Sequence, residues 1–283
     1  LDFHRDMESY KKAKKKFFLD NHIQWKVFNI DDPVGREFSG EFKTDSFTTG
    51  IDNNADFKAE DITLTKTGSQ FTLKTPFGTA EIQSNLLGQH NIHNLLSAAA
   101  GAMAQDISLK IIQEVFRQIR PIPGRFENID NDQGFSVLVD YAHTEDALSK
   151  AISAAKAFTR GKLIVVFGCG GDRDNGKRKA MGQAVINEAD FSIITSDNPR
   201  TEDPEQIIED ILQGVPSSAQ EGIDYLAIIN RKEAIHHAIH LAEKNDLVLI
   251  AGKGHEDYQV IGTQAIHFDD REVARSALRK RSR

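Results

Sequence analysis

Residues 163–178 read Leu-Ile-Val-Val-Phe-Gly-Cys-Gly-Gly-Asp-Arg-Asp-Asn-Gly-Lys-Arg. The first five are continuously apolar, which is typical of a strand buried on both faces. The glycine-rich remainder carries arginine and lysine, so it can offer backbone N–H groups and positive charge to an anion. A buried strand that opens into such a loop favours a parallel α/β sheet with a ligand site at the strand's carboxyl end.

Three further polar loops follow apolar, strand-like runs. They are the segments 140–144, 197–200 and 252–256. Because the carboxyl ends of parallel strands meet at one edge of a sheet, we expect these loops and the glycine-rich loop to converge on one site. Their mixture of acidic and basic residues indicates a charged, zwitterionic substrate together with a phosphate.

Composition narrows the class of protein. The chain has 283 residues, of which 39% are hydrophobic and 27% charged, as in globular proteins with room for two domains. A net charge of −7 argues against a nucleic-acid partner, and no apolar run approaches the length of a membrane span. A single cysteine excludes an internal disulfide. We therefore expect a cytoplasmic protein without nucleic-acid or membrane partners, and our working expectation is a monomer.

The pattern of elements changes at the segment 121–124, Pro-Ile-Pro-Gly, where we place a domain boundary. Before it we expect a helix at 6–18, a strand at 24–30, a meander of antiparallel strands over 61–85, and helices at 91–105 and 108–120. After it strands alternate with helices, which predicts a parallel sheet. The expected strands are 135–140, 162–167, 191–196, 224–229 and 246–251, and the expected helices are 145–158, 177–188, 204–213, 231–244 and 270–280.

Five ordered motifs carry a resemblance to a known family. They are the segments 124–127 (Gly-Arg-Phe-Glu), 139–144 (Val-Asp-Tyr-Ala-His-Thr), 167–173 (Phe-Gly-Cys-Gly-Gly-Asp-Arg), 197–200 (Asp-Asn-Pro-Arg) and 252–256 (Gly-Lys-Gly-His-Glu). In order and spacing the chain resembles the Mur ligases, over its whole length. The resemblance implies an α/β fold, with part of a central ATPase domain at 1–120 and a Rossmann-like, mostly parallel C-terminal domain at 121–283 that binds the incoming amino acid.

The resemblance also implies a reaction. ATP, with Mg²⁺, phosphorylates a substrate carboxylate, and an amine attacks the acyl phosphate, so positioning and stabilisation of phosphate charge dominate catalysis. The members most similar to this chain add the third amino acid of the peptidoglycan stem peptide. The implied substrates are ATP, meso-diaminopimelate and UDP-N-acetylmuramoyl-L-alanyl-D-glutamate.

Lys14 lies in Tyr-Lys-Lys-Ala-Lys-Lys-Lys-Phe-Phe (10–18), which is similar to the family's Tyr-x-x-Ala-Lys-x-x-Leu-Phe helix. The resemblance implies that Lys14 is a catalytic lysine converted by carbon dioxide into a carbamate. A carbamate would supply the oxygen ligands that Mg²⁺ prefers. The alternative is a solvated lysine, which is our interpretation of the neighbouring Lys11, Lys12, Lys15 and Lys16.

Four residues match the family's nucleotide contacts. Asn91 and Asn94 lie in Gly-Gln-His-Asn-Ile-His-Asn (88–94), where the family has Gly-x-Phe-Asn-x-x-Asn. Asparagine amides can pair with an adenine edge, but they also cap helices. Arg125 is expected to face phosphate or ribose, and Asp140, at a strand end, the ribose hydroxyls. The alternative for Arg125 and Asp140 is a structural role in a turn.

The amino-acid site is implied most sharply by Arg200. The segment 197–200 resembles the motif of members that select meso-diaminopimelate, and lysine-selecting members differ at the position of Arg200. Diaminopimelate carries a second carboxylate, which a guanidinium can hold with two hydrogen bonds. Arg173, in the glycine-rich loop, is the expected second partner of that carboxylate.

The ammonium beside that carboxylate needs acceptors. We expect Asp197 and Glu256 to accept from it, with the carbonyl of Gly252 alongside; a structural salt-bridge network is the alternative. The predicted amino-acid-binding residues are therefore Arg173, Asp197, Asn198, Pro199, Arg200, Gly252 and Glu256.

The family's phosphate-binding Gly-x-x-Gly-Lys-Thr segment does not occur in this sequence. The chain is therefore expected to be the carboxyl-terminal portion of a longer ligase and inactive alone. Three alternatives stay open: a lysine-adding ligase, a non-catalytic amino-acid-binding remnant, and a relative of folylpolyglutamate synthase. The last gives no reason for Asp-Asn-Pro-Arg.

Overall fold

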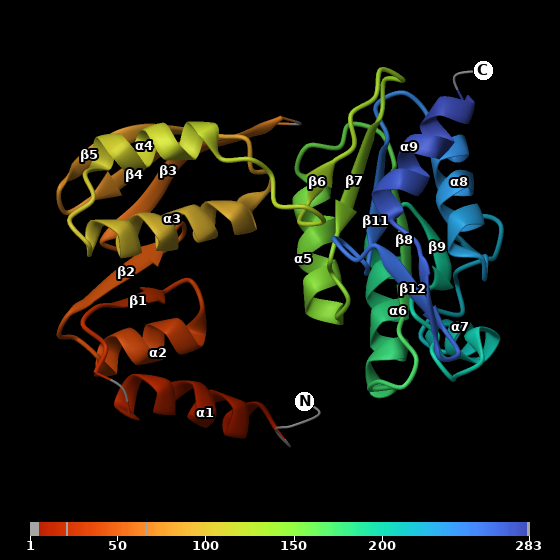
Figure 1. The fold of residues 1–283 in the computed structure, drawn as a ribbon, viewed down its shortest axis with the longest axis horizontal. Coiled ribbons are helices and arrows are strands. Elements are labelled where there is room, and N and C mark those ends of the chain that lie inside the picture. The colour runs from red at the N-terminus through yellow and green to blue at the C-terminus, as the bar shows by residue number, and fades with distance from the viewer. Residues whose placement is uncertain (1–5, 21, 66, 282–283) are drawn as a thin grey trace. The chain divides into compact units, whose positions relative to one another are not determined.

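The chain forms two compact units, Leu1–Arg120 and Pro121–Arg283 (Figure 1). The structure, a computed structural model, describes residues 6–20, 22–65 and 67–281. The units separate where Pro121 and Pro123 interrupt the chain, since proline cannot continue the preceding helix.

The first unit is built on a five-stranded sheet in the order β1-β2-β3-β4-β5. β1, β2 and β3 pair in parallel, whereas β3, β4 and β5 form the predicted antiparallel meander, which is confirmed. Its strands are β1 (Lys26–Asn29), β2 (Ser46–Gly50), β3 (Phe57–Thr65), β4 (Gly68–Thr75) and β5 (Gly78–Ser84). Its helices are α1 (Met7–Asp20), α2 (Pro33–Glu41), α3 (Gln89–Met103) and α4 (Leu109–Gln118).

A helix in this unit departs from expectation. Asp31-Asp32-Pro33 is typical of a turn that would end the strand expected at 24–30, but helix α2 begins there. The Asp32 carboxylate accepts hydrogen bonds from the backbone N–H groups of Val34 and Gly35, and Pro33 occupies the first turn, where its missing N–H costs nothing. The turn signal was therefore a helix start.

The second unit is a three-layer α/β structure. Its six-stranded sheet has the order β10-β9-β8-β11-β7-β6, parallel except for β6. The strands are β6 (Glu127–Asn128), β7 (Ser136–Asp140), β8 (Leu163–Cys169), β9 (Phe191–Ser196), β10 (Tyr225–Ala227) and β11 (Leu247–Ala251). The helices are α5 (Glu145–Lys156), α6 (Gly176–Glu188), α7 (Pro204–Leu212), α8 (Arg231–Leu241) and α9 (Asp270–Arg281). The predicted parallel sheet is confirmed.

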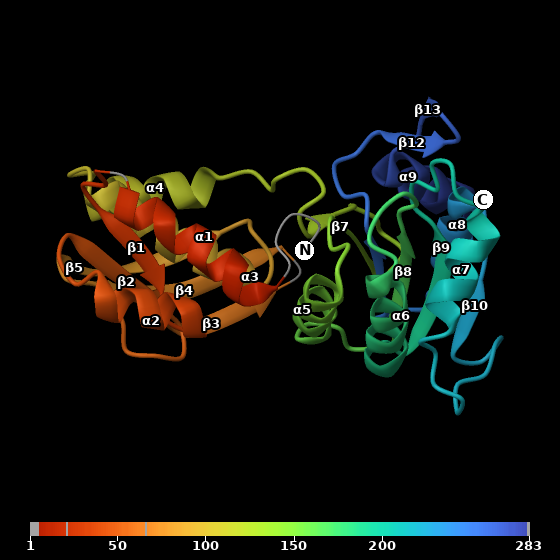
Figure 2. The same ribbon diagram turned by 90° about the horizontal axis from the view of Figure 1, so that it is seen from below.

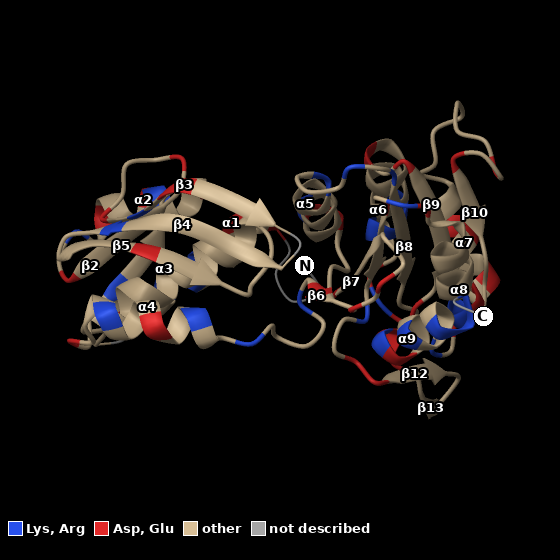
Figure 3. Ribbon diagram, turned by 90° about the horizontal axis from the view of Figure 1, so that it is seen from above, with Lys and Arg blue, Asp and Glu red and all other residues tan. Residues whose placement is uncertain are grey.

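Helices cover both faces of this sheet (Figure 2). α8 and α9 pack on one face, where Val166 and Val248 join the apolar core, and α5, α6 and α7 cover the other. All residues of β8 and β11 are buried, which explains their uninterrupted apolar sequences. Acidic residues begin α9 and basic ones end it (Figure 3), complementing the helix dipole.

A small hairpin was not expected from the sequence. β12 (Tyr258–Ile261) pairs antiparallel with β13 (Gln264–His267) through a turn containing Gly262. Arg200 forms a backbone bridge to Ile261, so the hairpin is attached to the loop after β9. In the part of the chain that the structure describes, no helix is both long and apolar enough to cross a bilayer.

Candidate functional site

Four strand ends meet at one edge of the second unit's sheet. β9, β8, β11 and β7 are consecutive neighbours and all run in the same direction. The loops that follow them therefore leave from the same edge. These are the loops predicted to converge, and they carry the expected amino-acid-binding residues.

Two glycines hold the start of this unit against the loop after β11. Gly124 has a φ of +65°, and a Cβ there would lie 2.0 Å from the backbone carbon of Gly254 and the nitrogen of His255. Gly254 has a φ of +54°, and a Cβ there would lie 2.7 Å from the carbonyl oxygen of Gly124. Only glycine permits this approach. It places Arg125 beside the sheet edge, with its exposed guanidinium 4.7 Å from the ring centre of Tyr141.

The Asp140 carboxylate bonds to backbone on both sides. Oδ2 accepts from the N–H of Phe126 at 2.8 Å, and Oδ1 accepts from the N–H of Ala142 at 2.9 Å. These bonds hold the turn at 124–127 against the end of β7. They agree with the alternative given above, a structural role in a turn. Nucleotide binding by Arg125 and Asp140 stays a prediction.

Asp197 lies beside Gly252 at the ends of β9 and β11. A Cβ on Gly252, whose φ is +118°, would stand 2.8 Å from Oδ2 of Asp197, so a side chain there would crowd the carboxylate. The Asp197 carboxylate accepts no hydrogen bond from any residue that the structure describes. Its backbone carbonyl accepts from Nε2 of Gln259 at 2.6 Å, which fixes the loop. The acid is therefore positioned with its acceptors available.

Asn198 and Pro199 are buried inside the loop contacts. The side chain of Asn198, in a residue only 3% exposed, donates to Oε2 of Glu256 at 2.9 Å and accepts from Lys253 and Val260. The carbonyl of Pro199 would be 1.9 Å from a Cβ on Gly171, so that close approach also requires glycine. Both residues shape the site from within.

Arg200 and Arg173 border the same glycine. A Cβ on Gly170 would lie 3.0 Å from Nη1 of Arg200 and 3.9 Å from Cγ of Arg173. Nη1 of Arg200 donates to the carbonyl of Gly171 at 2.7 Å, while Arg173 is exposed. The structure thus brings two guanidinium groups to the glycine-rich loop.

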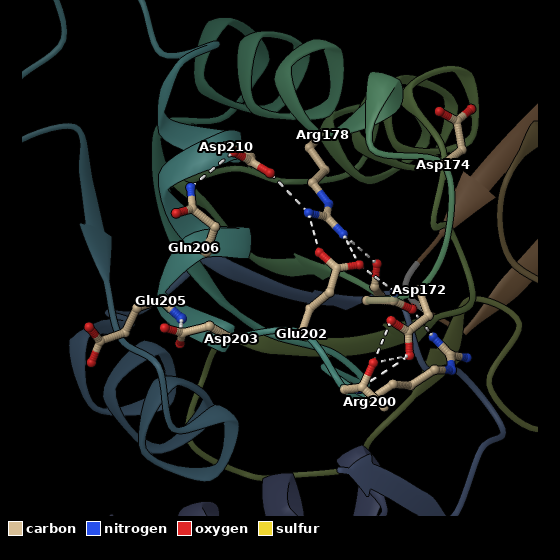
Figure 4. A network of polar contacts seen from close by, with 12 residues as sticks. Asp172, Asp174, Arg178, Arg200, Glu202, Asp203, Glu205, Gln206 and Asp210 are labelled. Atoms are coloured by element: carbon tan, nitrogen blue, oxygen red, sulfur yellow. Dashed lines mark hydrogen bonds and ion pairs between the residues drawn. The ribbon is translucent and has the colours of Figure 1, made fainter. Parts of the chain in front are cut away.

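A buried arginine that the sequence did not single out supports this loop (Figure 4). Arg178, only 1% exposed, donates to Asp210 at 2.9 Å and is paired with Glu202 at 2.8 Å. It also donates to the carbonyl of Gly170 at 3.3 Å. Nearby, hydrogen bonds from Thr201 hold the pKa of the Asp172 carboxyl below its usual value. The network ties the loop after β8 to the segment after Arg200.

A second buried arginine links two strand ends. Arg231 donates to the carbonyls of Ser196 and Ala251, the last residues of β9 and β11, at 3.3 and 2.9 Å. It forms a two-bond ion pair with buried Asp270 at 2.8 and 2.7 Å. Burial alone would lower the pKa of Arg231, but the Asp270 carboxylate outweighs it, and the pKa is raised. Asp197 and Gly252 follow these two carbonyls directly.

In the first unit, the two candidate asparagines lie at the start of α3. Asn91 is buried; it donates to the carbonyl of Leu87 at 2.7 Å and accepts from Asn94 at 3.1 Å. Asn94 is exposed, and its side-chain oxygen accepts no hydrogen bond from the residues that the structure describes. Hydrogen bonds at the start of α3 therefore fix the two side chains relative to each other. Their contact with a nucleotide base stays a prediction.

Lys14 differs from its lysine neighbours on α1. Its Nζ lies 5.2 Å from the ring centre of Tyr10, and the side chain is exposed. The neighbouring lysines are paired with acidic residues: Lys11 with Glu37, Lys15 with Glu41, Lys12 with Glu8 and Lys16 with Asp20. Among the described residues, no cluster of three His, Cys, Asp or Glu side chains could hold a metal ion.

Two family models match the chain. The Mur ligase middle domain matches residues 1–102, and the Mur ligase glutamate ligase domain matches residues 124–254. The chain belongs to the Mur ligase family. The two matches correspond to the two units, and the amino-acid loops fall in or next to the second match.

Individual Mur ligases are similar over almost the whole chain. UDP-N-acetylmuramoyl-L-alanyl-D-glutamate–2,6-diaminopimelate ligases of Geobacillus thermodenitrificans (strain NG80-2) and Clostridioides difficile (strain 630) are 45% and 44% identical over 99% of it. A solved structure of a ligase with the same name is 36% identical, with a TM-score of 0.65, over 99% of this chain and 58% of its own. The chain spans about 58% of the length of these two curated relatives.

Proposed function

We propose that this chain is the carboxyl-terminal portion of an ATP-dependent ligase that joins meso-diaminopimelate to UDP-N-acetylmuramoyl-L-alanyl-D-glutamate in peptidoglycan synthesis. The observation that carries the proposal is the grouping of opposite charges at one sheet edge. Arg173 and Arg200 border Gly170, while Asp197 and Glu256 lie on the two loops alongside. Such a set suits a substrate with both carboxylate and ammonium groups. The names of the similar ligases support the same substrate.

Each loop residue has a part in this proposal. The guanidinium groups of Arg200 and Arg173 bind the carboxylate that distinguishes diaminopimelate from lysine. The Asp197 and Glu256 carboxylates, with the carbonyl of Gly252, accept from the ammonium beside it. Asn198 and Pro199, both buried, hold the loop in shape.

Nucleotide and metal binding are assigned to further residues. Asn91, Asn94, Arg125 and Asp140 would contact ATP, and Lys14, as a carbamate, would be a ligand of Mg²⁺. Lys14 fits this role because, among the described residues, its amine is not paired with a carboxylate. Bound ATP and Mg²⁺ would activate the substrate carboxylate by phosphorylation. The chain's own contribution is to hold the amine and the phosphate in place.

The test is ligation by the full-length natural protein. Purified protein is incubated with ATP, Mg²⁺, the UDP-linked dipeptide and either meso-diaminopimelate or L-lysine, and the products are identified by mass. We expect ATP-dependent addition of diaminopimelate, with kcat/KM for lysine at least about 100-fold lower because lysine leaves the arginines unpaired. Preference for lysine would support the lysine-adding alternative. Tight binding of diaminopimelate without turnover would support a non-catalytic protein.

A further inference from the structure

A lysine is buried beneath the proposed ammonium site. Lys253 is 0% exposed, and its Nζ donates to Oδ1 of Asn198 at 3.0 Å and to Oε2 of Glu256 at 3.2 Å. The Nζ also lies 5.5 Å from the ring centre of Tyr258. Because an ammonium without partners is costly to bury, these contacts account for its position. These contacts could not be inferred from the sequence, because a lysine between two glycines is typical of a solvated loop.

Lys253 joins the loop after β9 to the loop after β11. Asn198 lies in the first loop and Glu256 in the second, and Asn198 also donates to Oε2 of Glu256 at 2.9 Å. The three side chains therefore form a closed triangle of hydrogen bonds. One carboxylate oxygen of Glu256 receives both bonds, while Oε1 accepts none from the residues that the structure describes. The triangle fixes Glu256 with one oxygen committed and one available.

The charges of Asp197, Glu256 and Lys253 set the net charge around the proposed ammonium site. Asp197 and Glu256 contribute two negative charges, and Lys253 contributes one positive charge that no solvent reaches. The net charge of this part of the site is therefore −1. That charge matches a single ammonium group of a ligand. Without Lys253 the two carboxylates would carry −2, and one of them would stay unneutralised when the ligand binds.

We propose that Lys253 is a positioning residue, an internal counter-ion that orients Glu256 and sets the site's charge for one substrate ammonium. The proposal rests on the proposed function, because the ammonium is that of the incoming amino acid. Lys253 acts through Glu256 and Asn198 and does not itself contact the substrate. Its loss should weaken binding of the amino acid while leaving nucleotide binding unchanged.

The first test is a steady-state comparison in the full-length protein. Lys253→Met removes the charge, and Lys232→Met is the matched control, because Lys232 is exposed on α8 of the same unit. We expect Lys253→Met to raise KM for diaminopimelate at least about 10-fold, since the partly buried Glu256 carboxylate loses its partner, with KM for ATP and kcat within about 3-fold of wild type. An unchanged KM for diaminopimelate, or equal losses in all three constants, would overturn the proposal.

The second test does not need ligase activity, so it can still be carried out if Lys253→Met is too unstable for kinetic measurements. Denaturation midpoints are measured for Lys253→Met and Glu256→Gln and for the double variant, which gives the coupling between the two sites. If Lys253 is the counter-ion of Glu256, its loss should lower the midpoint less when Glu256 is already neutral. Additive shifts would refute the counter-ion role. The two variants could be coupled in denaturation while the full-length protein fails to ligate diaminopimelate. That result would refute the proposed function, and with it the role of Lys253 in substrate binding. The ion pair between Lys253 and Glu256 would still stand.

Discussion

Replacing Asp270 by Asn should unfold the second unit more readily than any ordinary surface substitution. Asn has nearly the same shape, but it removes the charge that faces Arg231 across bonds of 2.8 and 2.7 Å. Both residues are buried, at 1% exposed for Arg231 and 0% for Asp270. The guanidinium would remain inside the protein without a counter-charge, with the carbonyls of Ser196 and Ala251 and at most one amide oxygen as acceptors.

The magnitude follows from the burial. Breaking a buried ion pair by removing one partner costs about 3–5 kcal/mol of the free energy of unfolding. For a domain of this size, each kcal/mol lowers Tm by about 2–4 °C. The expected decrease in Tm is therefore roughly 6–20 °C.

Circular dichroism of the full chain is the suitable measurement, because the one tryptophan, Trp25, reports on the first unit. Asp257→Asn is the matched control, since Asp257 is an exposed aspartate of the same unit, and we expect it to change stability by less than about 0.5 kcal/mol. If Asp270→Asn lowers the free energy of unfolding by less than about 1 kcal/mol, the ion pair with Arg231 does not stabilise the second unit as its burial and geometry indicate.

In thermal denaturation, Gly124→Ala should lower the stability of the chain by more than Gly262→Ala. The φ angles of Gly124 and Gly262 are similar, at +65° and +60°, but only at Gly124 would the new Cβ lie 2.0 Å from backbone atoms. Equal losses of stability would show that this close contact does not matter. Asp31→Asn should cost about 1–3 kcal/mol at neutral pH, because the Asp31 carboxylate accepts from the backbone at 51–53. Burial alone would raise the pKa of Asp31, but these bonds lower it below 3.8. Its contribution is thus complete well above that value and lost as pH falls through the lower folded pKa. Urea denaturation should therefore show the difference from wild type shrinking below about pH 4, and a constant difference would contradict this. Arg200→Asn, which suits the φ of +53°, should reduce the diaminopimelate-to-lysine ratio of kcat/KM at least about 10-fold, and an unchanged ratio would count against the role of Arg200.

Much of the second unit could be predicted because its signals are local. The apolar runs of β8 and β11 are buried on both faces, so the sequence shows them without interruption. The glycines of the 168–171 and 252–254 loops permit close backbone approach, which marks the sheet edge. β6, with two residues, and the β12–β13 hairpin were missed, because strands this short carry little pattern.

The buried cations could not be predicted for the opposite reason. Arg178, Arg231 and Lys253 look like solvated charges along the chain, and their burial depends on distant partners. Asp270 lies 39 residues from Arg231, and Asn198 lies 55 from Lys253. No periodicity records such pairs. The sequence thus predicted which loops meet at the sheet edge, and the side chains that hold those loops together had to be found in the structure.

The most direct test of the proposed site is a crystal structure of the full-length protein with meso-diaminopimelate. We expect one carboxylate of the ligand on the guanidinium groups of Arg200 and Arg173, and the neighbouring ammonium on Asp197 and Oε1 of Glu256. Lys253 should stay on Oε2 of Glu256. Diaminopimelate bound away from these loops, or bound with its carboxylate distant from both arginines, would contradict it.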